Sequence, residues 1–295
     1  MRRLKSIAVI GVGLIGGSFA MAMRRAGLTA SVVGCDRDPG ALQRAAELGI
    51  IDRAADSVTD AVRGCDLVMV AVPVRAIGRV LHDVSLALDG DAVVTDAGST
   101  KGEVVRIARD ELRERFPRFV PGHPIAGRET SGVDAATVEL FRGARVVLTP
   151  VAETSAQAIS LVRGVWESMG ARVSTTGAEE HDRIFAAVSH LPHLLSFALV
   201  NEIVSRGNAT ELLDFAGGGF RDFTRIAASS PEMWRDIVLQ NREALLAELD
   251  RYGARLAVFR ELIDKGEAAG LERLMAEARA TRLSLGSGRR GPGHE

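Results

Sequence analysis

Short apolar runs alternate with amphipathic segments along the first 175 residues. The apolar runs are rich in β-branched residues and predict strands at 6–10, 31–35, 67–72, 92–95, 118–120 and 145–148. The segments between them have helical spacing and predict helices at 14–26, 40–48, 75–88, 101–116 and 155–169. Strands that alternate with helices form right-handed βαβ units. The sequence therefore predicts an α/β Rossmann-like domain over residues 1–175, a doubly wound sheet that binds ligands at the carboxyl ends of its strands.

The pattern changes after Thr176, where apolar residues recur at helical spacing with no convincing strand between them. Helices are predicted within 179–204, 211–215, 231–262 and 267–284, which indicates an all-α domain over residues 176–285. The apolar content of 194–200 is high for a lone small bundle, and an excess apolar helix face is typical of a subunit interface. We therefore expect a homodimer. Residues 286–295 contain no core-forming side chain and are expected to be disordered.

The charges are balanced, with 37 basic and 38 acidic side chains and a formal net charge of -1. No overall field attracts nucleic acid or an anionic membrane, so an anionic small molecule must be held by a local site. The two cysteines, Cys35 and Cys65, are too few for a disulfide framework or a four-cysteine zinc site. Both lie in apolar runs, which fits buried free thiols in a reducing cytoplasm.

Two segments are similar to membrane-directed sequences. Basic residues before the apolar stretch 7–23 imitate a secretory signal peptide, but glycines interrupt that stretch at the spacing of a dinucleotide-binding turn. The later stretch 184–204 is apolar but contains two histidines, a proline, an asparagine and a glutamate, too many polar groups for a lipid-exposed span. We expect a soluble cytoplasmic protein with no membrane partner.

The first motif with chemical content is the glycine turn Gly11-Val-Gly13-Leu-Ile-Gly16, which follows an apolar strand and opens a helix. Gly11 permits a tight turn, Gly13 lets the backbone approach a pyrophosphate, and Gly16 allows close packing of helix on strand. Twenty residues beyond Gly16, Asp36 ends the second strand and can accept hydrogen bonds from a ribose. Asp36 repels a 2′-phosphate and favours NAD, whereas the neighbouring Arg37 could bind that phosphate or stack on adenine. NADP therefore stays open as the less favoured cofactor.

Other residues are expected to line the same edge of the sheet. Leu14 and Ile15 belong to the glycine turn, and Val72 and Pro73 end the strand near the nicotinamide half of the cofactor. Ser99 follows another strand in the segment DAGSTKG, where it could act in the site or cap the next helix.

A histidine follows the next strand of the predicted sheet, in the segment GHPIAGRETSG. We expect this residue, His123, to lie in a glycine-rich loop over the same cleft. Imidazole is the side chain whose ordinary pKa suits proton transfer near neutral pH. His123 is therefore the candidate catalytic base.

Two further segments in the helical part carry polar side chains. His190 and His193 share a helix face, and Pro192 is expected to kink that helix. A zinc pair normally has i, i+4 spacing and a third ligand, so no metal site is predicted. The segment GGGFRDFTR places Arg221 and Arg225 in a glycine-rich loop that enters a helix, an arrangement suited to gripping a carboxylate.

Taken together, GVGLIGGSFA, DAGSTKG, HPIAGRETSG, SHLPH and GGGFRDFTRIA resemble the prephenate/arogenate (cyclohexadienyl) dehydrogenase family of tyrosine biosynthesis, in the same order and over about residues 6 to 280. The resemblance implies a Rossmann domain, a helical dimerisation domain and an NAD-dependent oxidative decarboxylation. The substrate would be prephenate, which gives 4-hydroxyphenylpyruvate, or arogenate, which gives tyrosine. The resemblance also implies roles for individual residues. His123 matches the catalytic histidine of the family, Ser99 a serine that hydrogen-bonds near it, and Arg225 the arginine that binds the substrate carboxylate. Glu129 and His193 match residues that line the substrate pocket.

Two other classes of protein share parts of this pattern. β-Hydroxyacid dehydrogenases have a similar layout but need a catalytic lysine in the helical domain, and no lysine occurs between Lys101 and Lys265. A protein that senses NAD without catalysis would need Asp36 and the glycines but not His123. Among substrates we favour prephenate, with arogenate as the alternative.

Overall fold

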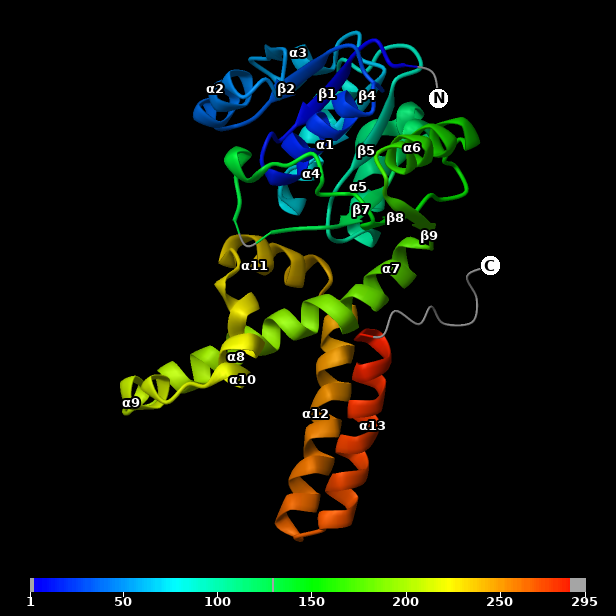
Figure 1. The fold of residues 1–295 in the computed structure, drawn as a ribbon. Coiled ribbons are helices and arrows are strands. Elements are labelled where there is room, and N and C mark those ends of the chain that lie inside the picture. Colours follow the sequence, from blue (N-terminus) through cyan, green and yellow to red (C-terminus); the bar gives the residue numbers. More distant parts are fainter. Residues whose placement is uncertain (1–2, 129, 287–295) are drawn as a thin grey trace. The chain divides into compact units, whose positions relative to one another are not determined.

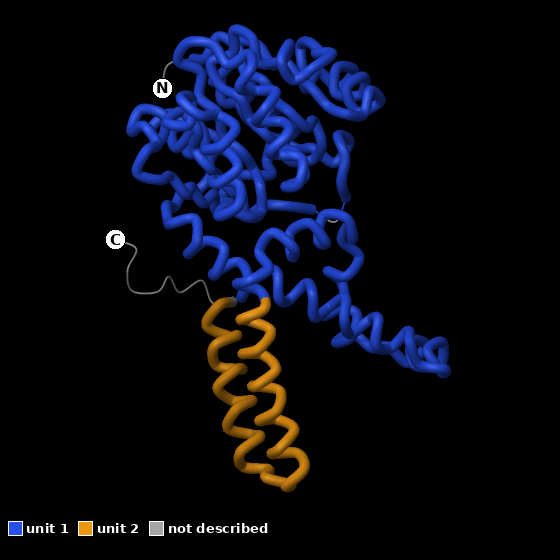
Figure 2. Tube along the Cα trace, turned by 180° about the vertical axis from the view of Figure 1, so that it is seen from behind, with its two compact units in different colours: residues 1–245 blue, residues 246–295 orange. Residues whose placement is uncertain are grey.

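The computed structural model describes residues 3–128 and 130–286 (Figure 1). It divides into two compact units, residues 1–245 and residues 246–295 (Figure 2). The first unit contains both sheets and the helices that precede α12. The second consists of the later part of α12 and the helix α13.

The main sheet has six parallel strands in the order β3-β2-β1-β4-β5-β6. Every residue of β1, β2, β4 and β5 is buried, as expected for strands covered on both faces. Since β1 pairs with β2 on one side and β4 on the other, chain order reverses beside β1, which is where such sheets bind ligands. The strands are β1 Ile7–Ile10, β2 Val32–Cys35, β3 Arg53–Ala54, β4 Leu67–Val70, β5 Val93–Asp96 and β6 Phe119–Val120.

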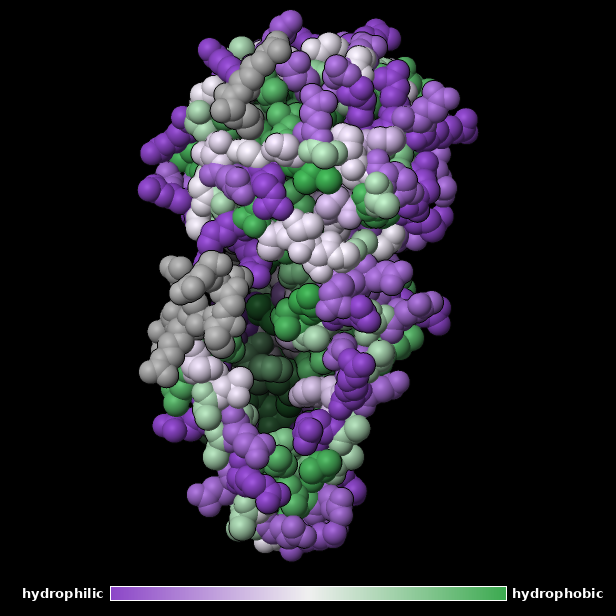
Figure 3. All heavy atoms as spheres, turned by 90° about the vertical axis from the view of Figure 1, so that its right-hand side faces the viewer, coloured by the Kyte–Doolittle hydropathy of each residue, from purple (hydrophilic) through white to green (hydrophobic). Residues whose placement is uncertain are grey.

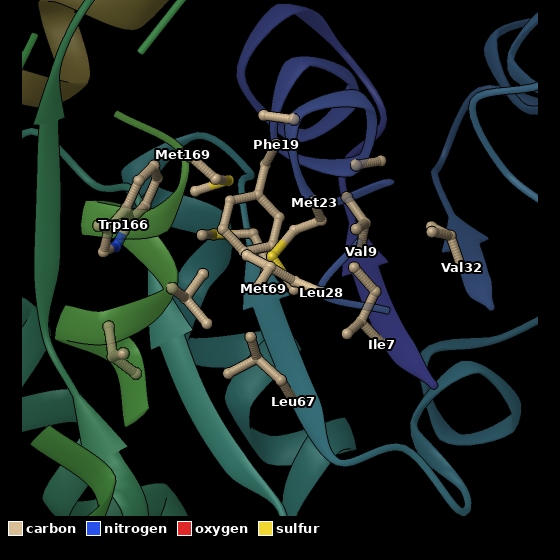
Figure 4. Packing of buried hydrophobic residues seen from close by; sticks show 14 of the residues in the cluster. Ile7, Val9, Phe19, Met23, Leu28, Val32, Leu67, Met69, Trp166 and Met169 are labelled. Atoms are coloured by element: carbon tan, nitrogen blue, oxygen red, sulfur yellow. The ribbon is translucent and has the colours of Figure 1, made fainter. Parts of the chain in front are cut away.

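Helices and 3-10 turns connect these strands, and apolar clusters lie on both sides of the sheet. In one cluster, Phe19 packs edge-on against Trp166, with ring centroids 5.2 Å apart (Figure 4). Phe141 packs edge-on against the same indole at 5.0 Å. The predicted doubly wound domain is confirmed. Its helices are α1 Leu14–Arg25, α2 Pro39–Glu47, α3 Val58–Val62, α4 Ile77–Ser85, α5 Gly102–Leu112 and α6 Ala156–Ser168, and its 3-10 turns are η1 Val74–Ala76, η2 Arg113–Arg118 and η3 Val133–Ala135.

A second, three-stranded sheet was not predicted. It contains β7 (Gly122–Ile125), β8 (Arg145–Leu148) and β9 (Arg172–Thr175), with β7 antiparallel to β8 and β8 parallel to β9. The expectation that 145–148 joins the main sheet was therefore wrong, and so was the loop expected at His123, which lies in β7. β7 is an edge strand, the position where a sheet tolerates a proline such as Pro124.

The described residues beyond Thr175 form helices and no strand, as predicted. The first stretch is continuous from Ala178 to Val204 and changes to π-helical spacing at Ala186–His190, just before Pro192. Because proline has no N–H to donate, irregular hydrogen bonding at this point accommodates it. The elements are α7 Ala178–Phe185, η4 Ala186–His190, α8 Leu191–Val204, α9 Ala209–Asp214, α10 Gly218–Thr224, η5 Arg225–Ala228, α11 Pro231–Gln240, α12 Arg242–Asp264 and α13 Ala268–Gly286.

Much of the apolar surface of these helices is uncovered. The stretch 178–204 is long and apolar enough to cross a membrane by length and composition alone, and only 22% of its most apolar window is buried. Val188 is 67% exposed, Leu239 59% and Phe215 85%. Figure 3 shows hydrophobic side chains gathered over the helical part of the chain. α13 ends at Gly286, and the rest of the predicted disordered tail lies outside the described residues.

Candidate active site

The glycine turn between β1 and α1 has space for a ligand where the motif requires it. Gly11 has a φ of +92°, and a Cβ on it would lie 2.4 Å from the Ala71 carbonyl oxygen. A Cβ on Gly16 would lie 1.9 Å from the Gly11 carbonyl oxygen, so neither position accepts another residue. At Gly13, by contrast, a Cβ would meet nothing within 4 Å. Gly13 is the N-cap residue of α1 and provides no side-chain cap, so the first amides of the helix are available to a pyrophosphate.

The acid that follows β2 is held in place by backbone amides. Val12 N–H donates to Asp36 Oδ2 at 2.8 Å, and Asp38 N–H donates to Asp36 Oδ1 at 3.0 Å. Each oxygen keeps a lone pair for a ribose hydroxyl. Arg37 is exposed beside it. The glycine turn and Asp36 therefore fit NAD. The four other residues predicted to contact this cofactor are at least partly exposed: Leu14, Ile15, Val72 and Pro73.

A buried ion pair connects the end of β5 to the start of β7. The Lys101 ammonium pairs with Asp96 and donates to the Gly122 carbonyl oxygen at 2.8 Å, and both side chains of the pair are fully buried. The Asp96 carboxylate also accepts from Gly98 N–H at 2.7 Å and Gly122 N–H at 3.1 Å. The pair therefore holds the loop that carries Ser99 against the strand that carries His123.

Ser99 does not cap α5, which excludes one of its two predicted roles. The residue that precedes α5 is Lys101, and the amides of Lys101 and Gly102 donate to the carboxylate of Asp182 at 2.8 and 2.7 Å. The partly exposed Ser99 hydroxyl has no hydrogen-bond partner among residues 3–128 and 130–286. It is thus available to a ligand.

His123 lies in β7 beside the carboxyl end of β5, and its ring contacts α7. His123 Nδ1 is 2.8 Å from His181 Nε2, and His181 Nδ1 is 2.8 Å from Asp182 Oδ1. The ring of Phe185 lies 4.9 Å from that of His123. Burial is the main cause that holds the pKa of His123 well below its ordinary value, and the nearby His181, Lys101 and His190 lower it further. His123 is therefore neutral at neutral pH, as a proton acceptor must be.

The same network continues toward the two histidines at the start of α8. The amide of Asn241 donates to the Asp182 carbonyl oxygen at 2.8 Å and lies 3.0 Å from His190 Nδ1. Burial lowers the pKa of His190 to about 4. Trp234 lies edge-on to His190 at 6.0 Å and stacks on His193 at 3.7 Å. The buried indole Nε1 of Trp234 has no partner among the described residues.

The predicted site residues His193 and Arg225 lie near enough for the charge of Arg225 to act on His193. His193 Nδ1 donates to the Ser189 carbonyl oxygen at 2.9 Å. Burial lowers the pKa of His193 against the effect of that hydrogen bond, and the charge of Arg225 lowers it further. Arg225 begins η5, and Arg221 lies in α10, so the expected glycine-rich loop is largely helical. Glu129 lies outside the described residues.

Sequence reasoning missed several residues of this network, namely Lys101, His181, Asp182, Trp234 and Asn241. For two of them, His181 and Asp182, the sequence does contain a signal, which is their helical spacing. His181 and Asp182 fall three and four residues after Ala178, and Phe185 follows at the same spacing, so both belong to the buried face of α7. A histidine and an acid on a buried helix face require polar partners.

The fold and these residues define a class of protein. A parallel sheet with a glycine turn, an acid placed to accept from a ribose and a neutral histidine at its carboxyl edge is the arrangement of a dinucleotide-dependent dehydrogenase. Comparison with known proteins defines it further. The family model described as prephenate dehydrogenase, nucleotide-binding domain, matches residues 19–175, and the one described as prephenate dehydrogenase, dimerization domain, matches residues 177–277. The chain belongs to the prephenate dehydrogenase family.

Similar proteins cover nearly the whole chain. The cyclohexadienyl dehydrogenase of Zymomonas mobilis is 39% identical over 97% of both chains. The crystal structure of prephenate dehydrogenase from A. aeolicus with hydroxyphenyl propionate and NAD+ has a TM-score of 0.91 and 38% identity, and covers 96% of this chain and 99% of that one. Synechocystis arogenate dehydrogenase has a TM-score of 0.81 and 29% identity, covering 95% and 99%.

Family membership bears out several expectations. The chain is an oxidoreductase with the nucleotide-binding domain of its family, and the A. aeolicus relative was solved with NAD+ bound. The dimerization-domain match indicates a homodimer that acts on a small molecule. The uncovered apolar side chains of the helical part, such as Val188 and Leu239, are consistent with that assembly.

Proposed function

We propose that the protein catalyses the NAD-dependent oxidative decarboxylation of prephenate to 4-hydroxyphenylpyruvate and CO2. The observation that carries this proposal is the neutral ring of His123 beside the carboxyl end of β5, next to the buried pair of Lys101 and Asp96. We further propose that the enzyme acts in the cytoplasm, where its buried thiols, Cys35 and Cys65, stay reduced.

The reaction requires a proton acceptor next to the hydroxyl group on the substrate ring. His123 would hydrogen-bond that hydroxyl and take its proton, which for a well-placed general base contributes a factor on the order of 10²–10⁴. NAD, when bound, supplies the hydride acceptor. The ring carboxylate leaves as CO2, and formation of the aromatic ring drives the reaction. Ser99, whose hydroxyl is available in the neighbouring loop, would hydrogen-bond near His123.

Binding would depend on the other predicted residues of the site. Arg225 would grip a carboxylate of the substrate through its guanidinium, which is shaped for two parallel hydrogen bonds. His193 and Glu129 would line the pocket around the substrate side chain. Holding the substrate in one orientation against the cofactor contributes as much as the base, because the reaction is unimolecular once both are bound.

Electrostatics supports the keto acid as the preferred substrate. Prephenate carries a pyruvyl side chain, whereas arogenate carries an ammonium group there. The positive charge of Arg225, which adds to the effect of burial in lowering the pKa of His193, would oppose a substrate ammonium in the same place. This supports prephenate over arogenate.

One observation favours arogenate as a second substrate. Since His193 donates from Nδ1 to Ser189, the neutral ring presents its Nε2 lone pair, which accepts a hydrogen bond from an ammonium. A neutral histidine gives no charge stabilisation to a keto acid. We therefore propose that arogenate is turned over less efficiently than prephenate.

Steady-state kinetics with each substrate and NAD tests the proposal. We expect a higher kcat/KM for prephenate, and a tenfold preference corresponds to about 1.4 kcal/mol in transition-state binding. A tenfold preference for arogenate would reverse the substrate assignment. The variant His123→Asn should lose activity by the factor expected of a general base. If it matches an active wild type, His123 is not the base. The alternative of an NAD-sensing protein without catalysis is favoured only if wild type itself turns over neither substrate.

A further inference from the structure

The His123 ring has one hydrogen-bonding neighbour within the described part of the chain, and that neighbour is another histidine. His181 is fully buried in α7, and its Nε2 lies 2.8 Å from His123 Nδ1. The other nitrogen of His181 lies 2.8 Å from Asp182 Oδ1. Three side chains thus form one line from the carboxylate to the candidate base. Because a neutral imidazole donates from one nitrogen and accepts at the other, the state of each ring fixes the state of the next.

This hydrogen-bonded chain begins at the Asp182 carboxylate, which can accept hydrogen bonds but cannot donate one. The Asp182 carboxylate accepts hydrogen bonds from the backbone amides of Lys101 and Gly102 at the start of α5, where the helix dipole favours a negative charge. Burial alone would raise the pKa of Asp182, but the hydrogen bonds from His181, Gly102 and Lys101 hold it below its ordinary value. An ionised carboxylate has no proton to give. His181 Nδ1 must therefore carry a hydrogen and donate it to Asp182.

The second ring is neutral, which determines what it offers to His123. Burial lowers the pKa of His181 despite the opposing effect of Asp182, and the charge of Lys101 lowers it further. A neutral His181 with hydrogen on Nδ1 has a bare Nε2. That nitrogen accepts from His123 Nδ1, so the hydrogen of the neutral His123 ring lies on Nδ1 and its Nε2 is bare.

We propose that His181, held by Asp182, is a positioning residue that fixes His123 in the tautomer whose Nε2 is free to accept a proton. This inference rests on the proposed function and names the residues that prepare its base. The same hydrogen-bonded side chains would also stabilise the protonated base. When His123 takes the substrate proton at Nε2, its Nδ1–H points at His181 Nε2, and the charge of Asp182 behind that ring stabilises the cation.

Without an acceptor at position 181, the His123 ring would no longer be held in this tautomer. The variant His181→Phe keeps an aromatic ring against Phe185, which lies 4.4 Å from that of His181, but removes the acceptor. The variant His181→Gln is the matched control, because its amide oxygen can still accept from His123 Nδ1. We expect kcat/KM to fall about 10²-fold or more in His181→Phe, the size of a lost general base, and clearly less in His181→Gln.

Nitrogen NMR of the histidine rings supplies a readout that a merely structural role would not move. In the protein labelled with 15N-histidine at pH 8, without substrate, His123 Nε2 should have the shift of an unprotonated nitrogen in wild type and His181→Gln. In His181→Phe the signal should move toward that of a proton-bearing nitrogen. The spectrum of His123→Asn assigns the signal among the six histidines.

Two results would overturn the inference. One is a wild-type spectrum in which His123 Nε2 carries the hydrogen, and this remains decisive even where His181→Phe does not fold. The other is a folded His181→Phe variant with wild-type kcat/KM and an unchanged His123 shift. Because the spectra need no substrate, they are separate from the proposed function, which fails instead if wild type turns over neither prephenate nor arogenate.

Discussion

Replacing Lys101 with methionine would test how strongly the fold depends on the ion pair behind His123. The side chains of Lys101 and Asp96 are both 0% exposed. The ammonium also donates to the Gly122 carbonyl oxygen at 2.8 Å. Methionine keeps most of the length and apolar character of the side chain but removes the charge and these hydrogen bonds.

The expected loss follows from what remains around Asp96. Removing one partner of a buried ion pair costs about 3–5 kcal/mol, because the remaining charge has lost its compensation. Asp96 would keep its bonds from Gly98 N–H and Gly122 N–H, which places the expected loss near the lower figure. For a unit of this size each kcal/mol shifts Tm by about 2–4 °C. We therefore expect Tm to fall by roughly 6–12 °C.

Thermal unfolding measures the change in Tm, and urea unfolding measures the loss of free energy. Both are done at one fixed protein concentration, because the stability of a dimer depends on concentration. Lys265→Met is the matched control, because Lys265 pairs with Glu261 at 2.6 Å on the surface, where both side chains are more than half exposed. That exposed pair should contribute little to stability, because water and salt screen it. If Lys101→Met loses no more stability than Lys265→Met, the reasoning about the buried pair is wrong.

Three further predictions concern cofactor, assembly and pH. Wild type should have a higher kcat/KM with NAD than with NADP, and Asp36→Ser should reduce the ratio of the two values at least tenfold, about 1.4 kcal/mol. Equal values for both cofactors in wild type would mean that Arg37, rather than Asp36, determines the cofactor preference. Light scattering at micromolar concentration should give about 63 kDa, twice the chain mass of 31.4 kDa, rather than a monomer. Because burial holds the pKa of His123 below its ordinary value, its neutral form persists below pH 6.5 and is lost only as pH falls further. The acid limb of kcat/KM should accordingly lie below pH 6.5, and a limb above that value would contradict a neutral His123.

The nucleotide-binding half could be predicted because its signals are local. The strands β1, β2 and β4 are continuous apolar runs, and each is fully buried. The glycine turn needs its residue types for backbone reasons that hold in any sequence, as the close approach of Gly16 to Gly11 illustrates. His123 could be proposed from its place after a strand, although the strand it occupies could not.

The parts that escaped prediction depend on contacts between distant segments. β7 reads GHPI, whose glycine and proline are typical of a turn, and only its pairing with β8 makes it a strand. β3 has two residues, and β9 is only partly buried, so neither has the apolar pattern of a strand. Asp182 is 80 residues from Gly102 along the chain, so neither local sequence shows that the two are in contact.

The carboxylate of Asp182 has a consequence for how this protein could be divided. It belongs to the helical region, yet it closes the open amino end of α5 in the nucleotide-binding domain. A fragment that stops at residue 175 would retain the glycine turn and Asp36 for the nucleotide but would have two amides without an acceptor and a His123 without its neighbour. Such a fragment could bind a dinucleotide without being able to use it. The two domains are therefore not interchangeable modules: a helical region grafted from another dehydrogenase would have to bring its own histidine and acid to this helix.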